Sequence, residues 1–138
     1  MDTKFSVAIH ALIMISESDK TVTSETIAHS VGTNASYIRR ILSLLRRDGI
    51  VEGRRKVGGF NLLISPENLT LFRIWKAVSG EEPHLFDIHQ NSNDTCIVGS
   101  HIKQTLTAMY GDLEQSFTKA LQGKTLNDCI IEMRSEIQ

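Results

Sequence analysis

Positive side chains are concentrated in one short part of this sequence. Residues 36–60 contain seven lysines and arginines and two acidic residues, so this segment carries a formal charge of +5 in a chain whose net charge is −1. The seven are Arg39, Arg40, Arg46, Arg47, Arg54, Arg55 and Lys56. The planar guanidinium of arginine matches the paired acceptors on the edge of guanine, and lysine and arginine both bind phosphate. This charge distribution makes nucleic acid the first partner to consider.

The elements that would position these side chains begin with two helices joined by a tight turn. Thr23 and Asn34 are good N-cap residues, and Glu25 lies where negative charge favours a helix dipole. Between the two caps, Ala28 is small enough for a close helix crossing. Gly32 accepts the positive φ that a sharp turn needs. The order predicts a helix-turn-helix.

The second helix of the pair has one apolar side and one basic side. Ile38, Ile41, Leu42 and Leu45 recur at helical spacing and form a single apolar stripe. Residues 50–54 and 60–64 read as two short strands, with a flexible tip at residues 55–59. The predicted fold is therefore mainly α with a small β-hairpin wing, a winged helix-turn-helix in the α+β class.

We expect two groups of side chains to contact DNA. At the start of the second helix they would meet base edges or adjoining phosphates in the major groove, and on the wing they would meet phosphates or the minor groove. The first group is Ser36, Tyr37, Arg39 and Arg40, and the second is Arg54, Arg55 and Lys56. The main alternative is a winged helix that binds proteins. Such a module has no need for so basic a wing.

The second half of the chain predicts a surface for a second copy. Leu71–Ser79 reads as a helix between the N-cap Thr70 and Gly80, and a long helix is expected at about residues 98–121. Its apolar stripe is Ile102, Leu106, Met109, Leu113, Phe117 and Ala120. Such a stripe exposes more apolar surface than a compact winged unit covers, so the first five are expected in a homodimer interface. A monomer that buries the long helix on its own core is the alternative.

This organisation divides the chain into three parts. Residues 1–80 are expected to form a winged helix-turn-helix DNA-binding domain, residues 81–97 a sensor-type loop, and residues 98–138 the dimerisation helix and a C-terminal helix. The apolar run at residues 7–15 is too short to cross a bilayer, which takes about 20 residues, and reads as a buried first helix. No phosphate loop or nucleophile elbow is present. We therefore expect a cytoplasmic protein that is not an enzyme and has no membrane partner.

Two cysteines carry different expectations. Cys129 falls in the apolar stripe of a helix at residues 126–134 and reads as ordinary packing. Cys96 precedes the long helix and has two interpretations: a redox-responsive thiol in an exposed loop, or a packed residue beside Ile97 and Val98. A small-molecule pocket between the winged unit and the long helix is a further interpretation of how a signal acts.

These segments together resemble the Rrf2 family of bacterial winged-helix transcription regulators, which includes the iron-sulfur cluster regulator and the nitric-oxide-sensitive repressor. The resemblance covers nearly the whole chain and is carried by Val7-Ala8-Ile9-His10-Ala11-Leu12, Thr26-Ile27-Ala28, Asn34-Ala35-Ser36-Tyr37-Ile38-Arg39-Arg40, Gly58-Gly59-Phe60, Leu69-Thr70-Leu71, Ala77-Val78 and Cys96. It implies a homodimer, usually a repressor, whose long helices cross and whose DNA affinity responds to a sensed signal.

One departure from that family concerns the cluster ligands. The resemblance implies that cluster-binding members have three cysteines in the loop before the long helix. Here Cys96 matches the last of these three cysteines, and residues 81–95 contain no cysteine. His84, Asp87, His89 and His101 lie nearby, but their spacing matches no ligand pattern. We therefore expect no cofactor and no metal.

Overall fold

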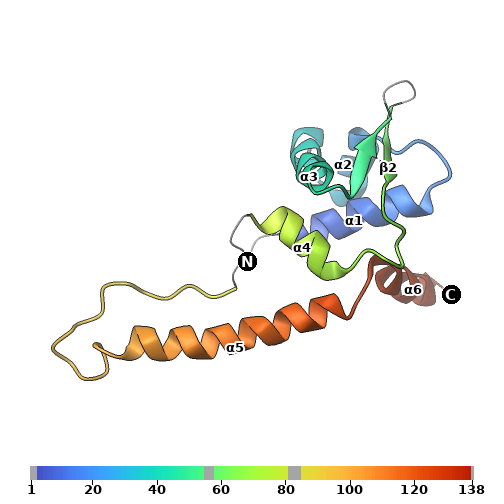
Figure 1. The fold of residues 1–138 in the computed structure, drawn as a ribbon. Helices are drawn as coiled ribbons and strands as arrows, with labels where there is room; N and C mark the ends of the chain where they lie inside the picture. Colours follow the sequence, from blue (N-terminus) through green and yellow to red (C-terminus); the bar gives the residue numbers. More distant parts are fainter. Residues whose placement is uncertain (1–2, 55–57, 81–84, 138) are drawn as a thin grey trace.

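The computed structural model describes residues 3–54, 58–80 and 85–137. In these ranges the chain forms a mainly helical α+β fold with one two-stranded sheet (Figure 1), as the sequence predicts. The elements are α1 (Lys4–Glu17), α2 (Ser24–Val31), α3 (Ala35–Arg47), β1 (Val51–Gly53), β2 (Phe60–Leu62), α4 (Leu71–Ser79), α5 (Ile102–Gln122) and α6 (Leu126–Ile137). None of the helices in these ranges is both long and apolar enough to cross a membrane.

A winged unit, made of α1 to α4 and the hairpin, contains most of the apolar core. Leu12 of α1, Ile27 of α2 and Ile38 of α3 are fully buried there. The caps that the sequence predicts are formed: Thr23 Oγ1 accepts the N–H of Thr26 at 3.2 Å, and Asn34 Oδ1 accepts that of Tyr37 at 2.9 Å. Because these ends are fixed locally, α2 and α3 begin where their sequences predict.

The hairpin is shorter than its sequence pattern predicts. Its register is antiparallel, with Val51 opposite Leu62 and Gly53 opposite Phe60. Hydrogen bonds continue beyond the ladder, from Leu63 N–H to Ile50 O at 2.9 Å and from Arg54 N–H to Gly59 O at 3.0 Å. The strands thus occupy three residues each, and the flanking residues are held by single bonds.

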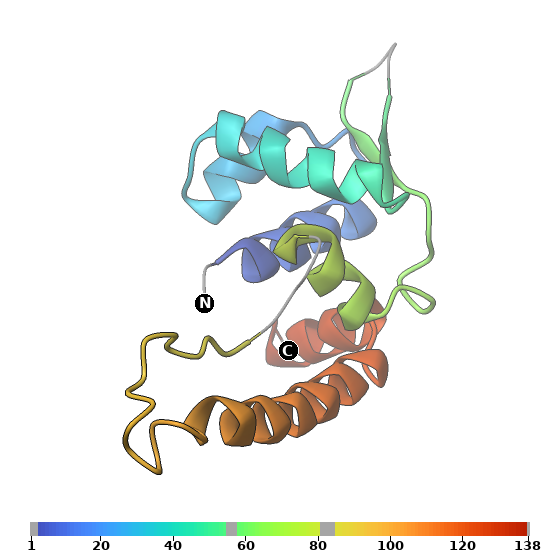
Figure 2. The same ribbon diagram turned by 60° about the vertical axis from the view of Figure 1, so that its left-hand side comes forward.

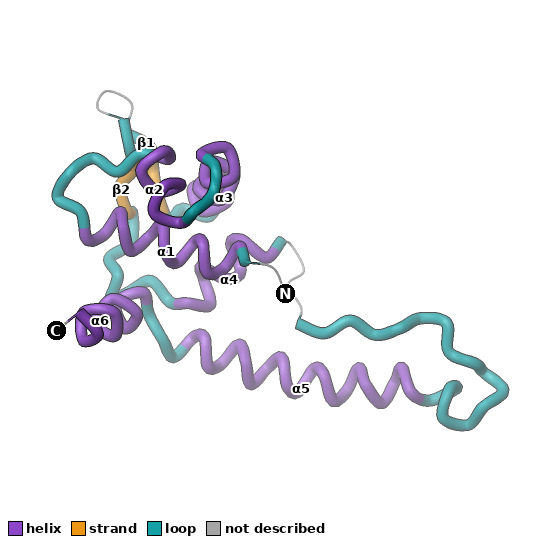
Figure 3. Tube along the Cα trace, turned by 180° about the vertical axis from the view of Figure 1, so that it is seen from behind, coloured by secondary structure: helices purple, strands orange, loops and turns teal. Residues whose placement is uncertain are grey.

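The long helix α5 begins at Ile102, four residues later than the predicted start at residue 98. Turns precede it: the Ser100 N–H bonds to Cys96 O at 2.9 Å, and His101 Nδ1 lies 2.7 Å from Ile97 O. The helix then continues through Gly111 without interruption, and its one buried residue is Leu121. Figure 3 shows α5 projecting from the winged unit with the preceding loop alongside it.

Two sets of contacts position this second half of the chain. Glu114 Oε1 on α5 accepts the backbone N–H groups of Leu85 and Phe86 at 3.2 and 3.3 Å, and the rings of Phe86 and Tyr110 lie 5.0 Å apart. At the other end α6 folds back against α1. It extends to Ile137, beyond the predicted end at residue 134.

Candidate nucleic-acid interface

The candidate recognition surface begins with the outer side of α3. Its apolar side is buried, since Ile38, Ile41, Leu42 and Leu45 are all at most 2% exposed. On the opposite side the structure exposes Ser36, Arg39, Arg40, Ser43, Arg46 and Arg47. Figure 1 shows α3 and the hairpin at the end of the molecule away from α5. The predicted recognition residues on α3 are thus brought together on one accessible face, with Tyr37 half-buried at its edge.

Arg39 is held by two weak polar contacts. Its Nη1 lies 3.3 Å from Glu25 Oε1 on α2, and its Nη2 donates to Ser36 Oγ at 3.4 Å. Both partners of the ion pair are exposed, with 54% and 71% of their side-chain surfaces accessible. An exposed pair of this kind contributes about 0 to 1 kcal/mol, so Arg39 can exchange Glu25 for another acceptor at little cost.

Arg40 is positioned differently, by an aromatic ring. Its guanidinium carbon lies 5.7 Å from the centroid of the Tyr37 ring, within the range of a cation–π contact. Tyr37 itself packs partly against the core. The Arg40 guanidinium therefore lies over a ring that the core holds in place, and it remains exposed.

The described part of the wing contains one of its three predicted basic residues. Arg54 is exposed at the root, where its carbonyl accepts the Gly58 N–H at 2.8 Å. Arg55 and Lys56 lie outside the described residues. Gly59, with φ 78°, touches the segment before α2, because a Cβ there would lie 2.5 Å from Thr21 Cγ2 and 2.8 Å from Val22 O. This close approach fixes the wing against the start of the helix-turn-helix.

The structure also shows what sequence reasoning missed at this surface. Glu25 is visible in the sequence only as a favourable first-turn acid, yet it is the ion-pair partner of Arg39. The two residues are 14 positions apart, so no helical spacing relates them. Arg46 and Arg47 lie in the last turn of α3, where positive charge also favours the helix dipole.

The chain itself does not bury Cys96. The thiol is exposed, and its neighbours Ile97 and Val98 are 79% and 62% exposed, so the packing interpretation is wrong for the single chain. The backbone N–H groups of Gly99 and then Val98 lower the pKa of the Cys96 thiol from its ordinary value. Gly99 is tightly placed, since a Cβ there would clash with the carbonyl oxygen of Asn93. The thiol thus lies in a compact turn that favours the thiolate.

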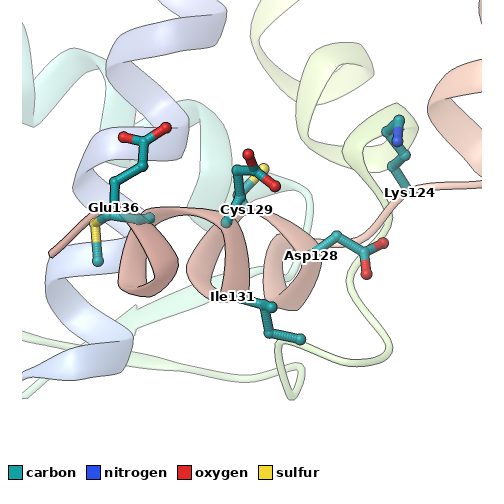
Figure 4. A pocket seen from close by; sticks show the side chains of 7 residues that line it. Lys124, Asp128, Cys129, Ile131 and Glu136 are labelled. Atoms are coloured by element: carbon teal, nitrogen blue, oxygen red, sulfur yellow. The ribbon is translucent and has the colours of Figure 1, made fainter. Parts of the chain in front are cut away.

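Cys129 behaves as the sequence predicts. It is half-buried against the core on α6, and Figure 4 shows it among the side chains of a surface groove that includes Asp128 and Glu136. Burial, followed by the nearby charge of Asp128, raises the pKa of the Cys129 thiol. This cysteine is therefore a packing residue with low thiolate character.

The predicted dimer residues on α5 fall into two groups. Met109 and Leu113 are 58% and 53% exposed, and Ile102 and Leu106 are half-buried. Phe117 is different, because its ring meets Trp75 of α4 edge to face, with 5.5 Å between centroids and an interplanar angle of 80°. Phe117 is thus engaged within its own chain, while the other four lie along the projecting part of the helix.

Comparison with known proteins connects this geometry to one family. The model of the Rrf2 family, described as iron-dependent transcriptional regulators, matches residues 1–132. YwnA of Bacillus subtilis (strain 168), a candidate HTH-type transcriptional regulator, is 36% identical over 128 residues, or 93% of this chain and 95% of YwnA. A crystal structure of a candidate DNA-binding protein is 31% identical with a TM-score of 0.76, covering 92% of this chain and 98% of that one. T. potens IscR shares the fold, at 19% identity, a TM-score of 0.71 and coverage of 96% and 87%.

The two cysteines and the described residues of this chain do not fit the iron in that family description. Iron–sulfur clusters are held by several thiolates, and the sequence has two cysteines. Cys96 precedes α5 and Cys129 follows it, and α5, with 21 residues, is about 30 Å long. Among the described residues, no group of three or more His, Cys, Asp or Glu side chains could hold a metal ion.

The remaining features agree with regulation rather than catalysis. The family match spans nearly the whole chain, and the relatives with 30% identity or more are described as transcription regulators and DNA-binding proteins, which are not enzymes. The second helix of a helix-turn-helix enters the major groove of DNA, and α3 is the second helix of such a pair in this chain. This chain belongs to the Rrf2 family of transcriptional regulators.

Proposed function

We propose that this protein is a homodimeric repressor that recognises a palindromic operator in double-stranded DNA and responds to a redox or small-molecule signal. The observation that supports this most is the start of α3. There Arg39 and Arg40 are exposed on a helix whose opposite side is fully buried. A helix with exposed arginines near its N-terminal end matches the way recognition helices enter the major groove.

In this proposal each basic group has a distinct role. Arg39 and Arg40 read base edges, and Ser36 and Tyr37 contact bases or neighbouring phosphates. Arg54, with Arg55 and Lys56 beyond the described residues, reaches phosphates or the minor groove. A good bidentate arginine–guanine contact contributes roughly 1 to 3 kcal/mol of discrimination, whereas phosphate contacts contribute affinity that is independent of sequence.

The proposed dimer rests on the exposed apolar side of α5. Met109 and Leu113 are more than half exposed, although they lie on one face of a helix that projects from the winged unit. A second copy of α5 would cover them, together with Ile102 and Leu106. A twofold axis would place two α3 helices in successive major grooves about 34 Å apart, which suits a palindrome.

Two features support a signal at the protein itself. The exposed Cys96, with its lowered pKa, is suited to react with an oxidant in the cytoplasm. A small-molecule signal is supported by an apolar groove of about 510 Å³ along α1, lined by Ile9, Ile13 and Met14 of α1 and Met133 of α6, with His10 and Ser30 at its polar side. This groove lies away from the predicted location, because its lining includes no residue of the long helix α5.

The test begins with selection of genomic fragments by the purified protein, with and without an oxidant such as hydrogen peroxide. We expect symmetric sites, and weaker recovery after oxidation. Arg40→Ala is expected to reduce affinity for the selected operator much more than for random DNA, whereas Arg54→Ala weakens both and flattens the salt dependence. Lys119→Ala removes the same charge from α5 and not from α3, and it serves as the control.

Two outcomes would contradict this proposal. Failure to select any duplex DNA, with capture of a protein partner in its place, would favour a winged-helix protein-binding module. Equal loss of specific and random binding in Arg40→Ala would remove Arg40 from base recognition.

A further inference from the structure

We infer that Arg73 is a positioning residue that links the α5–α6 turn to the end of the recognition helix and thereby fixes the half-site spacing that the dimer accepts. This inference rests on the proposed function, because it assumes two copies on one operator. Arg73 lies in the first turn of α4, which Figure 2 shows between the upper helices of the winged unit and the layer of α5 and α6.

The first link joins Arg73 to α3. Asp48 is the C-cap of α3, and Arg73 Nη2 donates to its backbone carbonyl at 2.8 Å. Arg73 Nε lies 3.5 Å from the Asp48 carboxylate, so one guanidinium contacts both the backbone and the side chain of the same residue. The carbonyl groups at a helix C-terminus lack donors within the helix, and a positive charge there is favourable.

The turn after α3 closes around the same side chain. Gly49 has φ 76°, and the position of a Cβ on it would lie 3.6 Å from Arg73 Nη2. Ile50 then returns its N–H to Leu45 O at 3.0 Å, directly before β1. Arg73 therefore contacts the point at which the recognition helix turns into the wing, so the two DNA-contacting elements share this anchor.

The second link joins the start of α4 to the α5–α6 turn. Leu71 N–H bonds to Lys124 O at 2.9 Å, and Leu126 N–H bonds to Leu69 O at 2.8 Å, around a bridge between Thr70 and Thr125. Thr70 also caps α4 by accepting the Arg73 N–H at 3.2 Å. Because these backbone bonds run in both directions, the start of α4 and the α5–α6 turn cannot slide past each other easily. The direction of α5 at this turn is therefore fixed relative to Arg73.

The length of α3 makes this anchor important for DNA spacing. With 13 residues α3 is about 20 Å long, so a tilt of ~10° about Asp48 would move its first turn by about 3.5 Å. One base-pair step is about 3.4 Å. Losing the contact at Asp48 would therefore let the base-reading end of α3 reach neighbouring registers, while leaving its own side chains unchanged.

The experiment compares full-length variants on duplexes that carry two operator half-sites separated by the natural distance or by one base pair more or less. Wild type is expected to prefer the natural distance by about tenfold, or 1.4 kcal/mol. Arg73→Ala is expected to reduce that preference to about threefold or less while binding a single half-site within about twofold of wild type. Lys76→Ala, which removes an exposed charge from the same helix, is expected to keep the wild-type spacing profile.

A second pair of variants separates positioning from folding. Arg73→Lys keeps the charge without the paired geometry and is expected to recover part of the spacing preference. Asp48→Asn keeps the backbone acceptor and is expected to lose only part of it. If Arg73→Ala does not fold, the spacing preference is measured with these two milder variants.

The outcomes distinguish this inference from the proposed function. An unchanged spacing preference in folded Arg73 variants, or a uniform loss at every spacing and at the single half-site, would overturn the role of Arg73 alone. A wild-type protein that binds one half-site as tightly as two would instead overturn the proposed homodimeric reading, and the inference with it.

Discussion

Phe117→Ala tests the contact that joins α5 to the winged unit. Replacing a fully buried phenylalanine by alanine lowers the free energy of unfolding by about 3 to 5 kcal/mol. An edge-to-face aromatic pair contributes about 0.5 to 1.5 kcal/mol. Phe117 is half-buried and packs on Trp75, which is 7% exposed. We therefore expect the variant to lower the free energy of unfolding by about 2 kcal/mol, which is less than for a fully buried phenylalanine.

The assay uses the single tryptophan of the chain. Because Trp75 is the one indole present, its emission reports this junction directly, and Phe117→Ala is expected to move the emission maximum to longer wavelength as water reaches the ring. In urea, a loss of about 2 kcal/mol with a slope near 2 kcal/mol per molar lowers the midpoint by about 1 M. Phe117→Leu keeps most of the apolar area and is expected to lose about 1 kcal/mol.

A change elsewhere on α5 provides the control for Phe117→Ala. Gln104→Ala, an exposed change on the same helix, is expected to stay within about 0.5 kcal/mol of wild type. The emission shift in Phe117→Ala should persist on dilution to monomer, because the contact lies within one chain, whereas an interface contact would depend on protein concentration. Unchanged emission and an unchanged midpoint would refute the packing of Phe117 on Trp75.

Three other changes address the helix-turn-helix and the cysteines. Asn34→Ala removes the cap of α3 and is expected to lower the free energy of unfolding by about 1 kcal/mol in urea, whereas Asn34→Asp keeps the acceptor; equal stability of the two would contradict the cap. Gly32→Ala places a methyl group on a residue with φ 86° and is expected to cost about 1 to 2 kcal/mol, measured in the same way, although no atom lies within 4 Å of the new Cβ. Iodoacetamide is expected to modify Cys96 before Cys129 between about pH 7 and 9, followed by mass spectrometry, because the lowered pKa of Cys96 increases its thiolate fraction and the raised pKa of Cys129 decreases it; equal rates would contradict these environments.

The parts of the fold that the sequence predicts are those set by near neighbours. Thr23, Asn34 and Thr70 cap helices through bonds to residues three positions ahead, so each signal lies within one turn. The apolar stripe of α3 likewise follows from helical periodicity alone, and it places the arginines on the opposite side. The exposed basic face of α3 can therefore be outlined from the residue pattern alone.

The parts that differ depend on contacts between distant residues. The apolar pattern continues through residue 98, so it cannot show that α5 begins at Ile102, where turns stabilised by side-chain and backbone bonds give way to helix. Glu114 contacts Leu85 and Phe86 from 29 and 28 positions away. Arg73 and Asp48 are 25 positions apart. No local pattern encodes pairs of this kind.

The close approach of Gly59 to the segment before α2 determines how freely the wing can diverge. In a saturation library, position 59 is expected to accept almost no replacement, because any side chain would meet Thr21 and the Val22 carbonyl as well as an unfavourable φ. Gly53, at the end of β1, has no positive φ, and no atom lies within 4 Å of the position that a Cβ would take, so most residues should be accepted there. Substitutions in this hairpin are thus expected at Gly53 in the first strand and not at Gly59. The side chains of the wing can therefore change while its contact with the segment before α2 stays the same.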